Sequence, residues 1–358
     1  MAINPDKMRG CLLGGAVGDA LGAPVEFLSD AAILHRYGPG GIADFESCYG
    51  VVGAVTDDTQ MTLWTLEGLC RGIVRGQLRG VSSIYSVVHG SLLRWLKTQG
   101  LHPAVDMRWM PDGWMLGERT LWARRGPGTT CLSALSHSSS LGEMAWNDRK
   151  GCGGVMRVAP VGFMHDSFFE LGADCAHLTH GHPTGYLTAG YLAEVIAGLQ
   201  QTPSLERALT RADAALARAS ASSEAPAALV GETAQALANA RHEAELALKT
   251  GVPSRIPTSL GEGWVAEETL AIAVYCALVG RDFEHAVRLA VNHGGDSDST
   301  GSVTGQILGA RDGVAVIPQR WLAKVECVSI VDRLVETFVG LDDGSVAAED
   351  IIGDFPEC

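Results

Sequence analysis

The chain has 358 residues, enough to bury a large core, and 46% of them are hydrophobic while 19% are charged. Its 27 basic and 41 acidic side chains give a net charge of −14, which argues against extended nucleic acid or a membrane surface as partner but not against a single nucleotide. The nine cysteines contain no C-x-x-C pair, so we expect free thiols and a cytoplasmic protein. We recognise no signal peptide or membrane span.

The first predicted helix covers residues 6 to 21 and ends before Pro24. Glycine recurs at every fourth residue along it, and a matching stripe occurs near residue 305. Since glycine has no side chain, we expect these two helices to cross closely in the core. The crossing would bring Glu26 near the loop before Thr300, although a lone Glu after a helix is more often solvated. The stripes are Gly10, Gly14, Gly18 and Gly22, and Gly301, Gly305 and Gly309.

Residues 28 to 55 are predicted to form a loop, and helices are predicted over residues 58 to 76 and 82 to 97. The sequence TDDT, residues 56 to 59, places two carboxylates directly before the first of these helices. Residues 98 to 155 are rich in loops and contain four tryptophans. Such tryptophans could stack on a base, but more often they fix a long loop to the core. They are Trp109, Trp114, Trp122 and Trp146.

Two short motifs follow this loop-rich stretch. The glycine-rich turn GCGGVMR, residues 151 to 157, could cradle phosphates with its N–H groups, but it matches neither G-x-G-x-x-G nor a Walker motif. The sequence HLTHGH, residues 177 to 182, has the spacing of a metal cluster, yet no nearby Cys or carboxylate completes a zinc set. We favour a hydrogen-bonding role for these histidines toward a ligand or a neighbouring helix.

The rest of the chain is predicted to be helical. A buried helix covers residues 186 to 200, and residues 204 to 250 form two solvated outer helices separated at residues 220 to 226. Further helices are expected over residues 267 to 278, 283 to 292 and 321 to 339. The content of Ala, Leu and Glu, with few alternating apolar runs, predicts an all-α fold.

The sequence HGGDSDST, residues 293 to 300, carries a second pair of carboxylates. Positions i and i+2 of a helix face different ways, so both carboxylates would converge only from a loop, with a helix following from about Thr300. Oxygen ligands from Asp, Ser and Thr suit Mg²⁺, Mn²⁺ or Ca²⁺ better than Zn²⁺. If the two acidic clusters meet, two divalent ions would supply the matching charge of about +4. The alternative interpretation is two unrelated helix caps.

Five patches in this order resemble the ADP-ribosylglycohydrolase family: residues 10–22 with Glu26, 56–59, 153–157, His180 and 295–298. The resemblance runs from residue 9 to about residue 310. It implies a single domain over residues 1–358, folded as a compact orthogonal multi-helix bundle. It also implies a hydrolase that removes ADP-ribose from proteins or small molecules, with ADP-ribosyl-arginine on proteins favoured. Alternatives are another linkage (serine, nucleic acid or small molecule), a phosphoesterase, and a non-catalytic ADP-ribose-binding or crystallin-like member.

The resemblance further implies a monomer with two divalent cations, Mg²⁺ in the first place and Mn²⁺ as the alternative. Glu26 and Asp296 match catalytic positions, with Glu26 as general acid/base or as a gate to the metals. The family often has Thr where Ser299 stands and usually Asn where Cys152 stands, so contacts to the distal ribose or diphosphate stay open at Cys152. The implied metal ligands are Thr56, Asp57, Asp58, Asp296, Asp298 and Ser299. The implied contacts to ADP-ribose are Gly151, Cys152, Gly153, Gly154, Met156 and His180.

Overall fold

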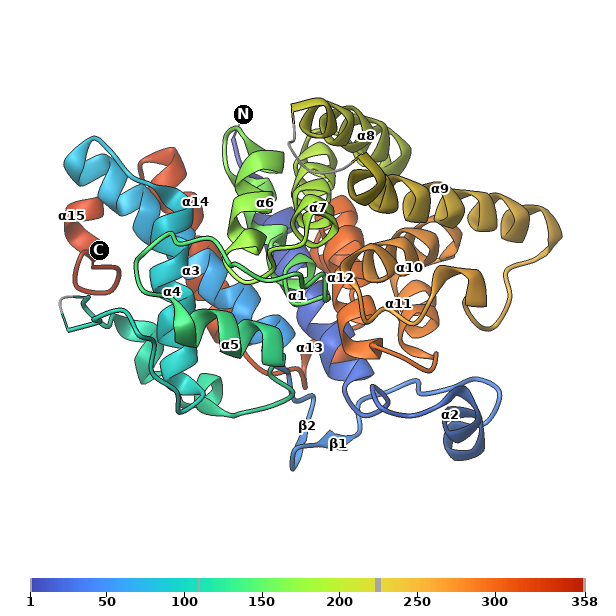
Figure 1. Ribbon diagram of the computed structural model, residues 1–358. Helices are drawn as coiled ribbons and strands as arrows, with labels where there is room; N and C mark the ends of the chain where they lie inside the picture. Colours follow the sequence, from blue (N-terminus) through green and yellow to red (C-terminus); the bar gives the residue numbers. More distant parts are fainter. Residues whose placement is uncertain (1, 109, 223–226, 357–358) are drawn as a thin grey trace.

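The computed structural model describes residues 2–108, 110–222 and 227–356, and the side chains of residues 222–230 are outside that description. Most of the described chain is helical (Figure 1), and the strands β1 (Ser47–Cys48) and β2 (Val51–Val52) form one short antiparallel pair within it. The all-α prediction is therefore confirmed. Trp109 and most of the predicted break at residues 220–226 lie outside the described residues. Among the described helices, none is long and apolar enough to cross a bilayer.

Helices of four to 24 residues make up the fold, together with short 3-10 turns such as η3 (Val155–Arg157). Most of the predicted helices occur within three residues of their expected bounds at both ends, among them those found as α1, α3, α4, α7, α10 and α11. The α-helices are α1 (Pro5–Gly22), α2 (Asp30–Tyr37), α3 (Asp57–Arg79), α4 (Ile84–Thr98), α5 (Thr129–His137), α6 (Phe168–His177), α7 (Pro183–Gln201), α8 (Leu205–Ser222), α9 (Ala227–Thr250), α10 (Ala266–Val279), α11 (Phe283–Val291), α12 (Ser297–Asp312), α13 (Gln319–Leu322), α14 (Val328–Asp343) and α15 (Ala348–Ile351).

Helices α1 and α12 cross at the centre of the molecule (Figure 1), and the glycine stripes form their interface. A Cβ atom added to any glycine of the first stripe would collide with the backbone of α12 or of the residue that follows it. The facing residues are Gly309 and Gly313 for Gly10, Gly305 for Gly14, Gly301 for Gly18, and Ser297 for Gly22. Two helix backbones can approach this closely only where glycine leaves no side chain between them, so the predicted crossing of the two helices is confirmed.

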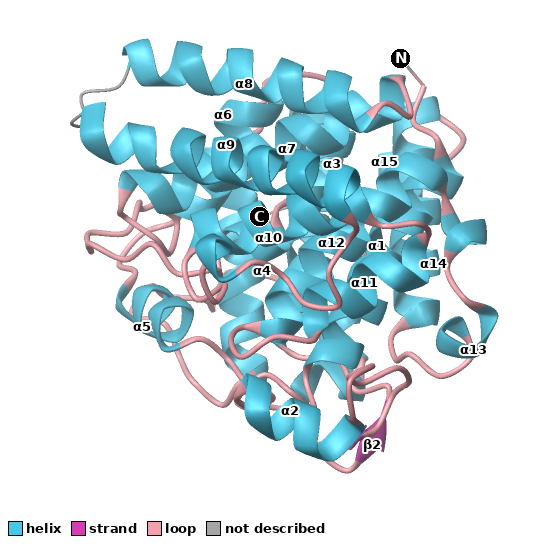
Figure 2. Ribbon diagram, turned by 90° about the vertical axis from the view of Figure 1, so that its right-hand side faces the viewer, coloured by secondary structure: helices cyan, strands magenta, loops and turns pink. Residues whose placement is uncertain are grey.

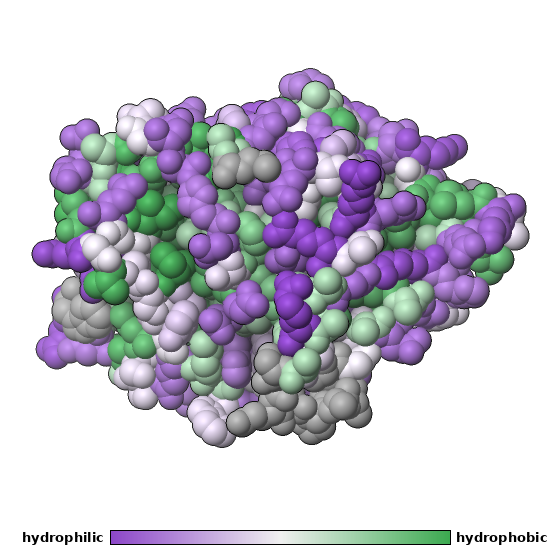
Figure 3. Space-filling view, turned by 90° about the horizontal axis from the view of Figure 1, so that it is seen from above, coloured by the Kyte–Doolittle hydropathy of each residue, from purple (hydrophilic) through white to green (hydrophobic). Residues whose placement is uncertain are grey.

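The other helices enclose this central pair. Helices α7, α10 and α11 pack on one side and α3 and α14 on the other, while α8 and α9 form an outer layer over α7 and α10 (Figure 2). The face seen in Figure 3 is covered largely by hydrophilic side chains with apolar areas between them. This arrangement agrees with the prediction of two solvated outer helices, and it leaves α1 and α12 surrounded by protein.

Three regions differ from the sequence prediction. Helix α2 lies in residues predicted as loop; Ile33 is its buried residue, so it shows no apolar period. Helix α5 lies in the loop-rich stretch and is nine residues long. The predicted last helix is divided into α13 and α14 by the turn of residues 323–327, and Cys327, the N-cap of α14, has a φ of 65°.

The tryptophans of the long loop behave differently from one another. Trp114 packs edge-on against Phe355 with ring centroids 6.1 Å apart, and the indole N–H of Trp122 donates to the carbonyl of Leu116 at 2.9 Å. Trp114 and Trp122 therefore fix the loop, as predicted. Trp146 is 98% exposed, so for this residue the prediction of a core anchor is wrong.

Candidate active site

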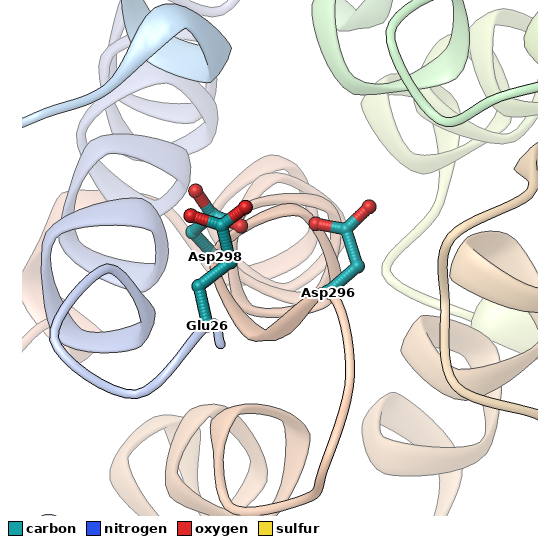
Figure 4. A group of neighbouring side chains, drawn as sticks. All are labelled: Glu26, Asp296 and Asp298. Atoms are coloured by element: carbon teal, nitrogen blue, oxygen red, sulfur yellow. The ribbon is translucent and has the colours of Figure 1, made fainter. Parts of the chain in front are cut away.

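Three carboxylates converge where α1 ends and α12 begins (Figure 4). Oxygen atoms of Glu26, Asp296 and Asp298 all lie within 4.8 Å of one another, and the three residues are buried. Glu26 comes from the turn after α1, whereas both aspartates come from the start of α12 (Figure 4). Gly22 contacts Ser297 directly, so the crossing of the two helices sets the separation of these carboxylates.

The second acidic cluster differs in detail from its prediction. Helix α12 begins at Ser297, three residues earlier than expected, so Asp298 lies in its first turn and Asp296 is the N-cap. The expectation that both carboxylates converge from a loop is therefore wrong for Asp298. Glycine is required at position 295 because a Cβ atom there would collide with the carbonyl of Glu262, and not because the chain turns there.

The first acidic cluster lies against the second. Thr56 caps α3, and its hydroxyl accepts from the N–H of Asp58 at 3.3 Å and donates to Asp298 Oδ2 at 3.3 Å. Asp57 Oδ2 accepts from the N–H of Gly128 at 3.2 Å. Two clusters 240 residues apart in the sequence thus meet through Thr56 and Asp298, although their roles as metal ligands stay predictions.

Asp19, which the sequence reasoning did not single out as a site residue, fixes the first cluster in place. Its fully buried carboxylate accepts from the N–H groups of Thr56 at 3.0 Å and Thr59 at 3.1 Å, and from the Thr59 hydroxyl at 2.5 Å. Burial and the charge of Asp298 raise the pKa of Asp19 to about 7. The sequence signal was a charged residue inside a glycine-rich apolar helix.

Burial and mutual repulsion make the ionised form of the cluster's carboxylates unfavourable. Burial, followed by the charge of Asp298, raises the pKa of Glu26 to about 10 and raises those of Asp57 and Asp58 well above the usual range. Asp296 is raised in pKa for the same reasons, and burial also raises the pKa of Asp298.

The donor set fits hard divalent cations. Glu26 Oε2, Asp58 Oδ1 and Asp296 Oδ2 are buried without a hydrogen-bond partner. Among the described residues that line this cleft none is Lys or Arg, so no side chain of the lining neutralises the carboxylates. Unpartnered buried oxygens are costly, and a divalent cation coordinated by carboxylates and hydroxyls would satisfy them.

The cleft beside the carboxylates has a volume of about 370 Å³. Besides the acidic residues and Ser299, its walls include the glycine turn at Gly151, Cys152 and Gly153. Gly154 is not part of the lining; it packs against Ala176 and His180 behind the turn. The wall also includes residues that the sequence reasoning did not identify, namely Phe27, Gly126, Gly128, Thr129, Thr130, Cys131 and Trp264.

The glycine turn is fixed from behind. Buried Arg157 donates to the carbonyl of Gly153, to the carbonyl of Cys175 at 2.9 Å and to the Thr179 hydroxyl at 2.8 Å. A Cβ atom on Gly153 would lie 2.7 Å from Cys131 Sγ, so only glycine fits at this position. The close packing holds the turn in one position against the cleft.

The three histidines of residues 177–182 have separate roles. His180 lines the cleft, and its Nδ1 lies 2.8 Å from the Thr179 hydroxyl; burial and Arg157 lower its pKa to about 3, so it is neutral. His177 stacks on Tyr186, and the His182 side chain caps α7. Among the residues that the structure describes these histidines form no metal-binding group, which agrees with the hydrogen-bonding interpretation.

Two aromatic rings border the mouth of the cleft. Phe27 is 76% exposed and stacks on Trp264, which is 39% exposed, with ring centroids 5.8 Å apart. Phe27 directly follows Glu26, while Trp264 follows Gly263, where an added Cβ atom would lie 3.4 Å from Asp296. The stack therefore joins the Glu26 segment to the opposite wall of the cleft.

Comparisons with known proteins agree with this geometry. The model of the ADP-ribosylglycohydrolase family matches residues 2–346. The chain is 24% identical to the ADP-ribosyl-[dinitrogen reductase] glycohydrolase of Rhodospirillum rubrum, over 90% of both chains. It is 26% identical to the ADP-ribosylarginine hydrolase Tri1 of Serratia proteamaculans, over 92% of this chain and 78% of that one. A solved structure described as an ADP-ribosylglycohydrolase-related protein complex superposes with a TM-score of 0.65 at 25% identity, covering 94% of this chain and 98% of the other.

Proposed function

The chain belongs to the ADP-ribosylglycohydrolase family, whose members hydrolyse ADP-ribosyl glycosidic bonds, and from this premise we propose that it removes ADP-ribose from arginine side chains of proteins. The observation that carries the proposal is the convergence of two acidic clusters around a cleft without Lys or Arg in its described lining. An acidic cleft favours a cationic acceptor, and the guanidinium of arginine is such a cation. The names of two relatives, which specify dinitrogen reductase and arginine, support the same choice.

We further propose two divalent cations, Mg²⁺ first and Mn²⁺ as the alternative. The oxygens that would hold them belong to Thr56, Asp57, Asp58, Asp296, Asp298 and Ser299. When bound, such ions supply Lewis acidity and neutralise the negative charge of the cluster. The number and identity of the ions are part of the proposal, which the unpartnered oxygens of the cluster support.

The chain's own groups would bind the substrate and move a proton. The glycine turn and the neutral ring of His180, which both line the cleft, would contact the ADP-ribosyl group without adding charge to the cleft. Glu26 Oε2 is buried among the carboxylates without a partner. A carboxyl group at this position can hold a proton and deliver it to the leaving nitrogen at the anomeric carbon.

The direct test is incubation with one protein ADP-ribosylated on arginine and another ADP-ribosylated on serine, each with and without EDTA. We expect release of free ADP-ribose from the arginine substrate, lost in EDTA and restored by Mg²⁺ or Mn²⁺. Faster release from the serine substrate would refute the arginine assignment. Release of phosphate would indicate a phosphoesterase, and binding without release would indicate a non-catalytic member.

The remaining proposals concern the state of the protein. We propose a cytoplasmic monomer in which residues 1–358 form a single domain. The eight cysteines within the described part of the chain are all free, which supports a reducing environment. Sedimentation of the purified chain at micromolar concentration tests the monomer directly.

A further inference from the structure

One wall of the acidic cleft carries two sulfur atoms. Cys152 lines the cleft together with Asp296 and Ser299, and burial, followed by the charges of Asp296 and Asp58, raises the pKa of its thiol. The Ser299 hydroxyl donates to Met156 Sδ at 3.9 Å. All four residues line the same cleft, so the sulfurs lie beside two of the oxygen ligands proposed for the cations.

The position of the thiol is fixed by the glycine turn. The Cys152 N–H donates to the carbonyl of Trp264 at 3.3 Å, and the Cys152 carbonyl accepts from the N–H of Met156 at 3.1 Å. Next to the turn, Gly151 pairs with Val265 in an isolated β-bridge. The backbone of the turn is thereby held on both sides, which fixes the place of Cys152 in the wall of the cleft.

Two open carboxylate oxygens belong to residues that line the same cleft as Cys152. Asp296 Oδ2 and Asp58 Oδ1 have no hydrogen-bond partner, and their residues are only 3% and 2% exposed. The charges of both aspartates act on Cys152. An orphaned buried carboxylate oxygen on each of two aspartates offers a ligand to a cation, independently of the cysteine itself.

We propose that Cys152 supplies a sulfur ligand to one of the cations and thereby raises the affinity of that position for thiophilic divalent ions, such as Co²⁺, Zn²⁺ or Cd²⁺, relative to its affinity for Mg²⁺. The proposal rests on the proposed function in that it requires the acidic clusters to bind divalent cations. Thiolate sulfur is a soft ligand, and adding it to an oxygen set raises affinity for these ions much more than for Mg²⁺. When the sulfur–metal bond forms, the S–H bond breaks and its proton passes to solvent.

This assignment changes the role expected for Cys152. The resemblance placed it among the contacts to ADP-ribose, where the family usually has Asn. An Asn side chain offers an oxygen, so Cys152→Asn restores the usual residue and removes the sulfur. Cys152→Ser removes the sulfur with almost no change of shape.

The experiment titrates Co²⁺ into the full-length chain after its metals have been removed with a chelator. We expect a sulfur-to-cobalt charge-transfer band in the near ultraviolet for the wild-type protein, and its loss in Cys152→Ser and Cys152→Asn. Cys48→Ser, which changes the other half-buried cysteine of the described residues, is the matched control and should keep the band. Competition titrations should show the preference for Zn²⁺ over Mg²⁺ falling by about tenfold or more in Cys152→Asn.

The outcomes separate this proposal from the proposed function. If Co²⁺ binds the wild-type protein without the band, or if both Cys152 variants keep it, sulfur ligation is wrong while Mn²⁺ binding and hydrolysis stand. If neither Mn²⁺ nor Co²⁺ binds the wild-type chain, both the sulfur ligand and the metal-dependent function are refuted. Loss of the band with unchanged Mn²⁺ binding in Cys152→Ser supports the proposal, since it shows that the variant is folded and its oxygen ligands are intact.

Discussion

The glycine crossing can be tested separately at its two ends. At the end near the site, a Cβ atom on Gly22 would lie 2.6 Å from the Cα of Asp298. At the far end, a Cβ atom on Gly10 would lie 2.7 Å from the carbonyl oxygen of Gly309. Both obstacles are backbone atoms, which cannot rotate away, so Gly22→Ala and Gly10→Ala must each force the helices apart.

The expected loss can be worked out from these contacts. In an open helix Gly→Ala stabilises by about 1 kcal/mol, whereas overpacking costs about 1–3 kcal/mol or more. Because the added Cβ atom collides with backbone, the cost of overpacking exceeds the gain in helix propensity. We therefore expect the free energy of unfolding to fall by about 2 kcal/mol. An unfolding entropy of about 2.1 cal/mol/K per residue gives about 0.75 kcal/mol/K for 358 residues, so this loss lowers the Tm by about 3 °C.

Calorimetric unfolding and Mn²⁺ titration together form the assay. Both variants should lose stability, but Gly22→Ala should also weaken Mn²⁺ binding, because it separates Glu26 from Asp298. Gly231→Ala is the control: this glycine lies in α9 with no atom within 4 Å of an added Cβ, so stability should be unchanged or slightly higher. Wild-type Tm in both crossing variants would refute the crossing. Wild-type Mn²⁺ affinity in Gly22→Ala would refute its role in setting the site.

Three further predictions concern the carboxylates. Asp57→Asn or Asp296→Asn should cut hydrolysis by about 10²-fold or more with little change in Tm, and full activity in excess chelator with no bound metal would refute the two-cation site. Glu26→Gln should keep Mn²⁺ and ADP-ribose binding by calorimetry yet lower turnover by about 10²–10⁴-fold, whereas a change below about twofold would make Glu26 a bystander. The raised pKa values, about 7 for Asp19 and about 10 for Glu26, mean that the folded metal-free chain binds more protons than the unfolded chain. Its Tm should therefore fall as the pH rises from about 4 through 7, and saturating Mn²⁺ should reduce this fall; a flat profile in EDTA would contradict the reasoning.

Much of the fold was predictable because its signals are local. The apolar period of a long buried helix and a glycine at every fourth residue each define a helix face within one segment. Two of the short helices gave no such signal: α2 has Ile33 as its buried residue, and α5 follows a loop glycine as its N-cap. The turn between α13 and α14 ends at Cys327, whose positive φ is a conformation that few non-glycine residues adopt and that the sequence does not announce.

The parts of the site whose residue types reveal their chemistry were predictable from the sequence. The parts that depend only on contacts between distant segments were not. Paired aspartates before helices indicate oxygen ligands, and the acidic clusters do meet at Thr56 and Asp298. Asp19 acts through hydrogen bonds to residues about 40 positions away, which no local pattern encodes. The stack of Phe27 on Trp264 joins segments 237 residues apart, and neither residue lies in a recognisable motif.

The crossing and the acidic cluster explain each other physically. Carboxylates brought within 4.8 Å of one another in a buried site repel, and a flexible scaffold would relieve the repulsion by moving apart. Glycine-to-glycine backbone contact between α1 and α12, with every surrounding position buried, leaves little room for such movement. In the metal-free chain the repulsion is therefore reduced by taking up protons, which is what the raised pKa values describe. A cation that enters must displace those protons, so its affinity should increase with pH while the helices themselves stay in place.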